Sequence, residues 1–587
     1  MRVLHELQGK MKEENIDFYI VPTGDPHGSE YTPSTYKDRE WLTGFTGSAG
    51  TALITLEEGF VWIDGRYYIQ GEKQLKGSGF QMKKAGLPET ETLEEAILRL
   101  AKPQDTIGFN GKLLMESQLK SLKKSLNKRK VFYKDKDLIS PLWKDRPGLS
   151  KEGLFLLELQ YTKYSASEKI KQVQDILWEK NLDGTVISSL DDIAWTCNLR
   201  GKDIPENPVF YSFMVITKRE ATLYLPVEKQ EREILDYLRD QNIYVRDYDQ
   251  MYLDGKNTRG SRLYLDPQKT SATLYKNLEE GNEIHEGINI TTNLKGIKNE
   301  LEIENQKKAY ITDGIALVKY FHWLKNHGIG TKEFDAQIQL TNFRKESNLY
   351  IEDSFTPISA YGSNGAMMHY SADANDSTRI EPKGFYLIDS GGHYFTGTTD
   401  ITRTLAMGPL TEEEIRDYTL TLKSHIALAT TVFLENTTGN ELDAIARRPL
   451  WKYMMDYKCG TGHGVGYVLN VHEGPHNISR NKINVPLKPG MVVTIEPGVY
   501  KEDKYGIRLE NVYVVKEVGE SSDGKFYGFE VLSYVPLEPM AIDPSLLTSD
   551  ELDWLNEYHK ITYLSLKDYI NEETKDWLKE VTKPIGD

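Results

Sequence analysis

The order of apolar and polar residues indicates that the first half of the chain contains two similar α/β segments. In the first segment, helical spacing over residues 4–14 precedes an apolar strand at 18–22. In the second, a capping box that begins at Ser165 opens a helical pattern, and an apolar strand follows at 184–188. The later parallels pair Trp41–Gly44 with Trp195–Asn198, and residues 52–55 with 214–217. Because the same elements recur in one order, we interpret the segments as copies of one unit.

The pattern changes near residue 297. Helical spacing runs from Asn299 to about Asn326, and a second helical pattern covers 331–347. Strands rich in Gly and Thr follow, interrupted by a helix that the capping box at Thr411 opens. Residues 551–587 read as one or two short amphipathic helices that would dock on their own core or on a twin subunit. We expect an α/β (α+β) fold with three domains, at 1–152, 153–297 and 298–587.

Composition narrows the possible partners. The chain has 72 Lys and Arg against 88 Asp and Glu, a formal net charge of −16. Such a surface repels phosphate backbones and anionic lipid, so we expect neither nucleic acid nor membrane partners. The sequence has no run of about 18 apolar residues, so we expect no membrane-spanning helix, and its charged start argues against a signal peptide. The two cysteines, Cys197 and Cys459, are far apart, which favours a reducing, cytoplasmic location.

Five residues of metal-binding type lie in the third segment, where strands end or glycines cluster. They are Asp389, Asp400, His463, Glu496 and Glu510. Asp389 ends an apolar strand and Asp400 lies on the return strand, so a hairpin can place both carboxylates at one end of a sheet. Glu496 ends another apolar strand, and alternation along residues 505–514 puts Arg508 and Glu510 on one face. His463 is surrounded by glycines, which permit close approach of the backbone.

Charge favours a dinuclear metal centre for this set. Singly, each carboxylate would fit a solvated turn, but four together would repel and raise one another's pKa values. Two divalent cations would offset four negative charges, and a hydroxide that bridges them is a nucleophile at neutral pH. Oxygen-rich ligation with one nitrogen suits Mn²⁺ or Co²⁺, and Zn²⁺ is possible.

Three motifs of this segment resemble those of the pita-bread metallopeptidases, which include methionine aminopeptidase, prolidase, creatinase and aminopeptidase P. They read DSGGHYFTGTTDITRT, GTGHGVGYVLNVHEGP and TIEPGVY followed by YGIRLENV. Because the N-terminal half is doubled, the chain is most similar to the three-domain cytosolic Xaa-Pro aminopeptidases. The resemblance implies a C-terminal pita-bread domain and a homodimer. It also implies hydrolysis of the bond between an N-terminal residue and a penultimate proline, by attack of a metal-bridging hydroxide.

The resemblance also assigns the metal ligands position by position. It implies that Asp389 binds one of two divalent metal ions, which we expect from the ligand types to be Mn²⁺. Asp400 and Glu510 would bridge both ions. His463 and Glu496 would bind the second.

The same resemblance implies further catalytic roles. Glu496 would act as the general base, while His369 and His472 would orient the peptide and stabilise developing charge. Arg508 would orient the metal-binding carboxylates. In one position the chain departs from the family, because Cys459 stands where a histidine is usual. We interpret this as a tolerated change with a reduced rate, rather than a new redox or metal function.

Two alternative functions use the same fold. A non-catalytic pita-bread module would bind peptides without metal, but retention of all five ligand positions argues against it. A prolidase-type dipeptidase would need the free carboxylate next to the scissile bond, and the doubled N-terminal unit weighs against it.

Two polar loops in the first half are weaker candidates. The loop around Asp25 and His27 is interpreted as a hydrogen-bonded surface loop, because no further metal ligands accompany it. The second loop holds Arg200, Asp203 and Asn207. Similar loops in the resembling family face the catalytic cleft, so contact with the substrate N-terminus stays open beside a structural role.

Overall fold

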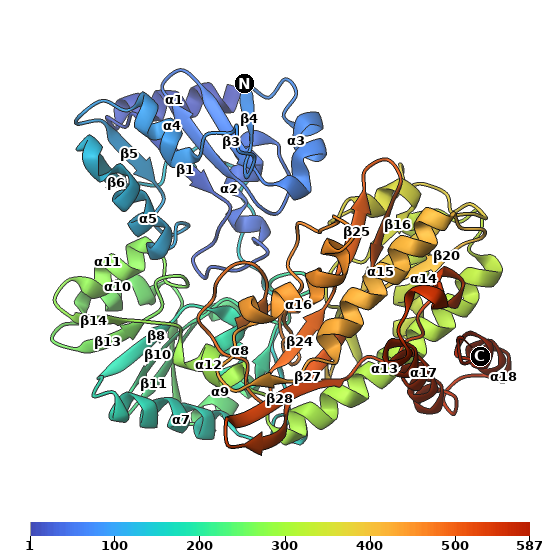
Figure 1. The fold of residues 1–587 in the computed structure, drawn as a ribbon. Coiled ribbons are helices and arrows are strands. Elements are labelled where there is room, and N and C mark those ends of the chain that lie inside the picture. Colours follow the sequence, from blue (N-terminus) through green and yellow to red (C-terminus); the bar gives the residue numbers. More distant parts are fainter. Residues whose placement is uncertain (1, 587) are drawn as a thin grey trace. The chain divides into compact units, whose positions relative to one another are not determined.

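The computed structural model describes residues 2–586, with every side chain except that of Ile69. These residues form two compact units. Unit 1 contains the chain up to Leu156 together with Tyr164–Thr291, and unit 2 contains Leu157–Lys163 and the chain from Thr292 onward. In Figure 1, unit 1 is coloured from blue to green, and the part of unit 2 from residue 300 onward from yellow-green to red.

The first part of unit 1 is built on a six-stranded sheet with the order β4-β3-β2-β1-β5-β6. Its strands are β1 (Phe18–Pro22), β2 (Thr51–Thr55), β3 (Gly59–Ile63), β4 (Phe80–Lys84), β5 (Thr106–Phe109) and β6 (Phe132–Asp135). Its helices are α1 (Arg2–Glu13), α2 (Asp38–Thr43), α3 (Tyr68–Gln74), α4 (Leu93–Leu100) and α5 (Glu116–Leu126). Strands β1, β2 and β3 pair antiparallel, whereas β4, β5 and β6 each run parallel to their inner neighbour.

The second part of unit 1 repeats this arrangement, with the order β12-β11-β10-β8-β13-β14. Its strands are β8 (Gly184–Ile187), β10 (Phe213–Thr217), β11 (Ala221–Leu225), β12 (Ile243–Asp247), β13 (Arg262–Leu265) and β14 (Glu283–Glu286). Its helices are α7 (Ala166–Glu179), α8 (Leu190–Cys197), α9 (Arg232–Asp240), α10 (Gln250–Asn257) and α11 (Ala272–Glu279). Corresponding strands have the same directions as in the first sheet.

The likeness extends to single residues. Asn15 and Asn181, which precede the first strand of each sheet, both have left-handed backbone with φ of 53° and 56°. Two residues later, the Asp17 carboxylate accepts a hydrogen bond from the Thr106 N–H (2.8 Å), and Asp183 accepts one from the Arg262 N–H (2.9 Å). The expected pair of related α/β segments is therefore confirmed. Their origin by duplication stays an interpretation.

Residues of the two polar loops of unit 1, around His27 and Asp203, form hydrogen bonds and an ion pair within this unit. His27 is 1 % exposed, with Nδ1 at 2.9 Å from the Ser188 carbonyl oxygen and Nε2 at 2.7 Å from the Tyr248 hydroxyl. Our expectation of a surface loop is wrong here, because residues of the second segment bury the imidazole and satisfy both of its nitrogens. In the other loop, the buried Asp203 carboxylate pairs with the buried ammonium group of Lys229 at 2.6 Å.

Unit 2 is formed by long helices around several small sheets. Its main helices are α13 (Glu300–His327), α14 (Glu333–Arg344), α15 (Glu412–Ala429), α16 (Gly439–Trp451), α17 (Ser549–Leu566) and α18 (Glu572–Val581). Thr411 caps α15 with the expected capping box, and Asn299 caps α13 with another. Helix α14 is shorter at both ends than the sequence pattern indicates.

Three groups of strands in unit 2 carry the candidate chemistry. One sheet has the order β16-β17-β20, a larger one has β21-β28-β27-β24-β22-β23, and β25 pairs with β26. The strands of the first are β16 (Ile358–Tyr361), β17 (Phe385–Ser390) and β20 (Ile401–Ala406). Those of the second are β21 (Phe433–Leu434), β22 (Gly462–Gly464), β23 (Glu473–Ile478), β24 (Val492–Ile495), β27 (Asn511–Ser521) and β28 (Gly524–Val531). The pair consists of β25 (Gly498–Lys501) and β26 (Tyr505–Arg508). A further sheet joins β15 (Tyr350–Asp353), β18 (Gly392–Tyr394) and β19 (Gly397–Thr398).

One expected strand is two strands in different sheets. Alternation along residues 505–514 indicates a continuous strand, but β26 ends at Arg508 and β27 begins at Asn511. The intervening N–H groups of Leu509 and Glu510 donate to the Pro497 and Thr402 carbonyl oxygens instead of to one ladder. The chain therefore changes sheets at the residue that carries a candidate ligand.

The C-terminal helices pack on their own unit. Leu566 of α17 and Leu578 of α18 are fully buried and form an apolar cluster with Val318 of α13. Leu564 and Tyr569, two further large apolar residues of this C-terminal segment, are 50 % and 63 % exposed. Among residues 2–586, no helix is both long and apolar enough to cross a bilayer.

Candidate metal centre

The hairpin of β17 and β20 places two candidate carboxylates at one end of a sheet. In the antiparallel pairing, Asp389 lies opposite Thr402 and Ser390 lies opposite Ile401. Asp400 immediately precedes β20, so both aspartates are near the same edge. The hairpin expected from the sequence is thus present, with the short strands β18 and β19 inserted between its arms.

His463 is held in a strand where side chains would not fit beside it. A Cβ atom on Gly462 would lie 2.0 Å from the Thr494 carbonyl oxygen, and one on Gly464 would lie 2.2 Å from the Glu473 carbonyl oxygen. The flanking glycines therefore let β22 pack tightly against its neighbours and present the imidazole between them.

The hydrogen bonds of His463 fix which ring nitrogen is free to bind a cation. Nδ1 lies 2.9 Å from the Gly464 carbonyl oxygen, and because a carbonyl only accepts, Nδ1 must donate. In the neutral ring, Nε2 then carries a lone pair. It faces Asp400 Oδ2 at 3.3 Å and Glu496 Oε1 at 3.5 Å. A metal ion or a shared proton between these atoms offsets the carboxylate charges.

Glu510 completes the most compact part of the site. One ligand atom from each of Asp400, His463 and Glu510 lies within 4.8 Å of the others. The Thr402 hydroxyl donates to Glu510 Oε2 at 2.6 Å and fixes that carboxylate. Alternation along the chain places Thr402 on the same face as Asp400, which is the signal in the sequence that could have indicated its contact with the site.

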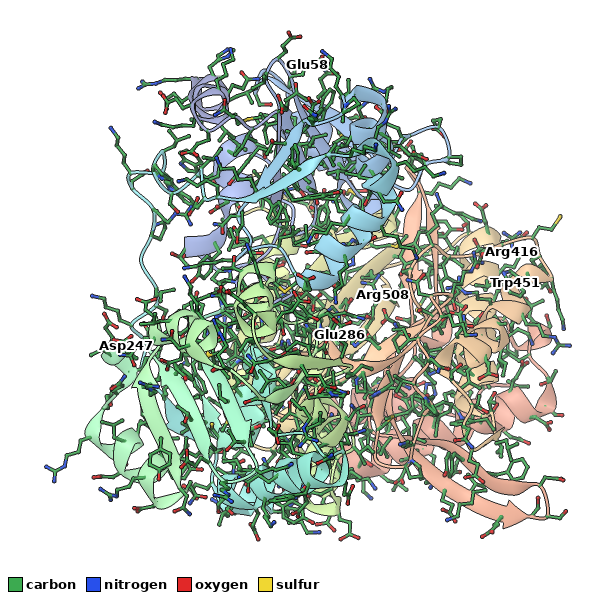
Figure 2. The ribbon with its side chains drawn as sticks, turned by 90° about the vertical axis from the view of Figure 1, so that its left-hand side faces the viewer. Glu58, Asp247, Glu286, Arg416, Trp451 and Arg508 are labelled. Atoms are coloured by element: carbon green, nitrogen blue, oxygen red, sulfur yellow. The ribbon has the colours of Figure 1, made fainter. Side chains whose placement is uncertain are left out.

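Asp389 is oriented by an arginine and keeps one oxygen free. Arg508, labelled in Figure 2, donates from Nη2 to Asp389 Oδ2 at 2.6 Å and from Nη1 to the Tyr500 hydroxyl at 2.9 Å. Asp389 Oδ1 is buried and has no hydrogen-bond partner among residues 2–586. Since buried carboxylate oxygens are normally satisfied, this atom is suited to bind a cation.

Burial and mutual repulsion destabilise the charged form of three of these carboxylates. Burial, followed by Asp400, Glu496 and Asp389, holds the pKa of Glu510 well above its usual range. Burial is also the largest cause that raises the pKa values of Asp400 and Glu496, to which neighbouring carboxylates add. The protein therefore leaves an excess of negative charge that bound divalent cations would offset.

The two expected catalytic histidines lie in different surroundings. The His472 ring stands edge-on to that of His463, with the centroids 4.3 Å apart. His369 is exposed in the loop after the 3-10 helix Gly362–Ala366, in which Gly365 packs against Gly506 of β26. Direct action of His369 on a substrate stays a prediction.

Cys459 is half-buried, and its thiol has a raised pKa. Burial, with a smaller contribution from Glu496, raises its pKa to about 11, and it hydrogen-bonds to Tyr500. A thiol with so high a pKa is neither a good nucleophile nor a ready metal ligand at neutral pH. These features favour the interpretation of Cys459 as a tolerated substitution.

Comparison with known protein families covers most of the chain. The model of metallopeptidase family M24 matches residues 304–517, and that of its C-terminal region matches 525–585. The model of the creatinase/prolidase N-terminal domain matches twice, at 4–139 and 145–302. A probable Xaa-Pro aminopeptidase P from Sordaria macrospora is 39 % identical over 607 residues, which cover 99 % of both chains. The chain belongs to metallopeptidase family M24.

Solved structures agree with membership of M24. An X-prolyl aminopeptidase from Caenorhabditis elegans, described as a cytosolic enzyme with a di-nuclear active site, is 30 % identical, with a TM-score of 0.94. The match covers 100 % of this chain and 99 % of that one. An Xaa-Pro dipeptidase from Bacillus anthracis, 23 % identical with a TM-score of 0.51 over 64 % of this chain and 99 % of its own, shows the fold alone. The expected resemblance, fold class and metallopeptidase character are confirmed.

Proposed function

We propose that this M24 chain is a dinuclear-metal aminopeptidase that hydrolyses the bond between an N-terminal residue and a penultimate proline. The observation that carries the proposal is the convergence of the His463 lone pair with the Asp400 and Glu496 carboxylates. Relatives named for the same activity, similar over the full chain, support the substrate class. The convergence of candidate ligands disfavours a metal-free binding module.

Five side chains would hold two divalent cations. Asp389 would bind one ion, Asp400 and Glu510 would bridge both, and His463 and Glu496 would bind the other. The oxygen-rich donor set with one imidazole favours Mn²⁺, with Co²⁺ or Zn²⁺ as alternatives. When bound, the ions supply Lewis-acid chemistry and a nucleophile derived from water at neutral pH.

The chain's own residues would orient the peptide and move the proton. Glu496, which accepts a hydrogen bond from the Thr494 hydroxyl at 3.1 Å, would take a proton from the nucleophile and return it to the leaving amine. His472, beside His463, and His369 would stabilise the charge that develops on the scissile carbonyl. Arg508 would keep Asp389 in its binding orientation.

The preference for proline follows from the chemistry of the bond. An Xaa-Pro amide has no N–H and proline fixes φ, so a site must activate the carbonyl group without a hydrogen bond to the leaving nitrogen. The surplus of carboxylates would also attract the free α-ammonium group of the substrate. Both features fit a peptidase that starts from an unblocked N-terminus.

Peptide hydrolysis tests the proposal directly. An Xaa-Pro-Xaa tripeptide would be offered to the manganese-loaded protein, to a chelated sample and to Asp400→Ala. Release of the first amino acid by the loaded protein alone would support the assignment. Cleavage restricted to Xaa-Pro dipeptides would identify a dipeptidase instead, and cleavage of neither peptide would contradict the proposal.

Three further properties are proposed on the family resemblance and the acidic, cysteine-poor composition. The chain would be cytoplasmic, it would form a homodimer, and its domains would divide at 152/153 and 297/298. Cell fractionation, light scattering of the purified protein and limited proteolysis test these points separately.

A further inference from the structure

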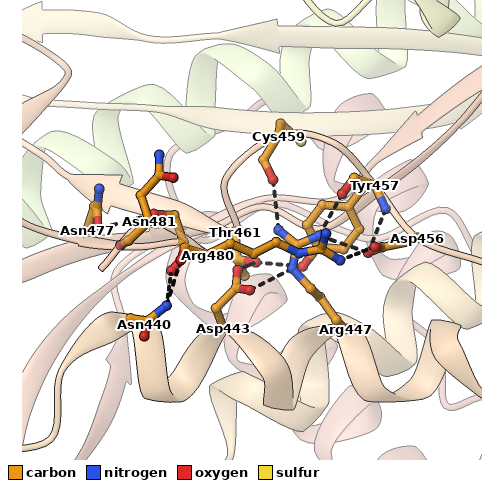
Figure 3. Close-up of polar contacts among 11 residues, drawn as sticks. Asn440, Asp443, Arg447, Asp456, Tyr457, Cys459, Thr461, Asn477, Arg480 and Asn481 are labelled. Carbon is orange, nitrogen blue, oxygen red and sulfur yellow. Dashed lines mark hydrogen bonds and ion pairs between the residues drawn. The ribbon is translucent and has the colours of Figure 1, made fainter. Parts of the chain in front are cut away.

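A buried ion pair on α16 lies outside the proposed set of ligands. Asp443 and Arg447, one helical turn apart, are 3 % and 1 % exposed. Arg447 Nε donates to Asp443 Oδ2 at 2.7 Å. Figure 3 shows the pair beneath the loop that leads to β22, with polar contacts that run from α16 to this loop.

Arg447 binds three groups of that loop in addition to Asp443. Nη1 donates to Asp456 Oδ1 at 2.9 Å and to the Tyr457 carbonyl oxygen at 2.6 Å, and Nη2 donates to the Cys459 carbonyl oxygen at 2.8 Å. The guanidinium group also lies 4.0 Å from the centroid of the Tyr457 ring. A planar fork with several donors can fix a backbone in this way, whereas a single ammonium group cannot.

Asp443 secures the end of the same loop. Its second oxygen, Oδ1, accepts from the Thr461 hydroxyl at 2.6 Å. The Thr461 hydroxyl has one proton and donates it to this carboxylate. The Tyr457 hydroxyl must therefore be the donor in its 2.6 Å contact with Thr461. The pair on α16 therefore determines the position of residues 456–461 from both sides.

The loop in turn is linked to two candidate site residues, to Glu496 by a hydrogen bond and to His463 through the chain. The Thr461 carbonyl oxygen accepts from the Glu496 N–H at 2.8 Å. Two residues further along, the His463 N–H donates to the Thr494 hydroxyl at 3.0 Å, and that hydroxyl donates to Glu496 Oε1. A shift of the loop would thus move both the imidazole and the carboxylate.

We infer that Asp443 and Arg447 are positioning residues that hold loop 456–461, and through Thr461 fix Glu496 and His463 for metal binding and proton transfer. The kinetic part of this inference rests on the proposed aminopeptidase function. The metal-binding part does not, so the two can be tested separately.

Arg447→Lys is the primary test, because it keeps the positive charge but removes the planar guanidinium group with its several donors. We expect binding of one of two Mn²⁺ ions, measured by calorimetric titration, to weaken by about tenfold or more. The visible absorption of the Co²⁺-loaded protein should change, because the imidazole and carboxylate are displaced. We expect kcat to fall by about tenfold or more while KM stays within about twofold.

Arg39→Lys in unit 1 is the matched control. Arg39 is also buried, and it donates to the Thr23 hydroxyl at 2.7 Å and to the carbonyl oxygens of Phe45 and Gly47. The same substitution therefore removes a similar set of hydrogen bonds to a loop that contains none of the proposed site residues. We expect a lower melting temperature, with metal affinity and kcat within about twofold of the wild type.

Thr461 provides a milder test if Arg447→Lys does not fold. Thr461→Val keeps the shape of the side chain and loses its hydroxyl bonds to Asp443 and Tyr457. We expect about fivefold weaker binding of one metal ion, and Thr461→Ser should restore wild-type affinity.

The results separate positioning from stability. The inference is overturned if folded Arg447→Lys or Thr461→Val binds both ions with wild-type affinity and an unchanged Co²⁺ spectrum, and differs only in melting temperature. If the wild type cleaves no Xaa-Pro peptide but the variants bind metal more weakly, the proposed function fails and the positioning role stands.

Discussion

The two units each bury charged side chains, but with different charge balance. In unit 1, the Asp203 carboxylate is matched by the Lys229 ammonium group, and it also accepts from the Tyr211 N–H at 2.8 Å. In unit 2, four carboxylates gather where Arg508 binds only one of them directly. Burial of charge alone therefore does not indicate a ligand site. A ligand site is indicated by a surplus of negative charge, together with the unpartnered Asp389 Oδ1 and the His463 Nε2 that faces two carboxylates.

Removal of a bridging carboxylate should have the largest effect. In Asp400→Asn, the amide would replace a charged metal ligand, so we expect kcat/KM for an Xaa-Pro-Xaa peptide to fall by about a thousandfold or more. Activity within a factor of about ten of the wild type would show that Asp400 is not a bridging ligand.

Substitution in the Asp203–Lys229 ion pair of unit 1 should lower the stability of the fold and leave the activity unchanged. Asp203→Asn would leave the buried Lys229 without its charge partner, at a cost of about 3–5 kcal/mol in the free energy of unfolding. We expect denaturant unfolding to show this loss, while kcat of the folded variant stays within about twofold. A large loss of kcat without a loss of stability would instead support a substrate contact in this loop.

The unbalanced cluster should also make the stability of the metal-free protein fall as pH rises above about 4. The pKa values of Glu510, Asp400 and Glu496 are raised in the folded state. Their contribution to stability is therefore complete below the unfolded-state pKa of about 4, and it is lost as pH rises through the raised folded values. We expect the melting temperature of the chelated protein to fall over this range.

Manganese should flatten this pH dependence at and above neutral pH, because the bound ions stabilise the charged carboxylates. Thermal melts of chelated and Mn²⁺-saturated protein across a pH series measure the difference. Parallel curves for the two samples would show that the carboxylates do not hold the metal.

The smallest effect is expected at Cys459. Because its half-buried thiol has a raised pKa, Cys459→Ala should change kcat/KM by less than about threefold. Steady-state kinetics with the same tripeptide check this value. A loss of about a hundredfold would show that the thiol has a direct role in catalysis.

Local patterns allowed much of the fold and site to be predicted. Capping boxes gave the start of α7 and α15, and a strand followed by a Gly-rich turn placed Asp389 and Asp400 at one edge. These features depend on short-range spacing, which a sequence displays directly. The resemblance of three motifs then supplied roles that spacing alone does not assign.

Long-range contacts set the limit of prediction. Alternation did not reveal that the chain changes sheets between Arg508 and Asn511, because period-2 spacing is the same within one strand and across two. The burial of His27 depends on Ser188 and Tyr248, far away in the sequence. The hydrogen bonds of Arg447 likewise go to a loop beyond its own helix. Such side chains are polar, and in the sequence they look like solvent-exposed residues.

Counting bound metal tests the central claim most directly. The apo protein would be equilibrated with Mn²⁺, freed of excess metal and measured by elemental analysis, beside Asp389→Asn and Asp203→Asn. The account predicts about two ions per chain for the wild type and for folded Asp203→Asn, and about one for Asp389→Asn. Absence of tightly bound metal in the folded wild type would contradict a dinuclear centre at this cluster.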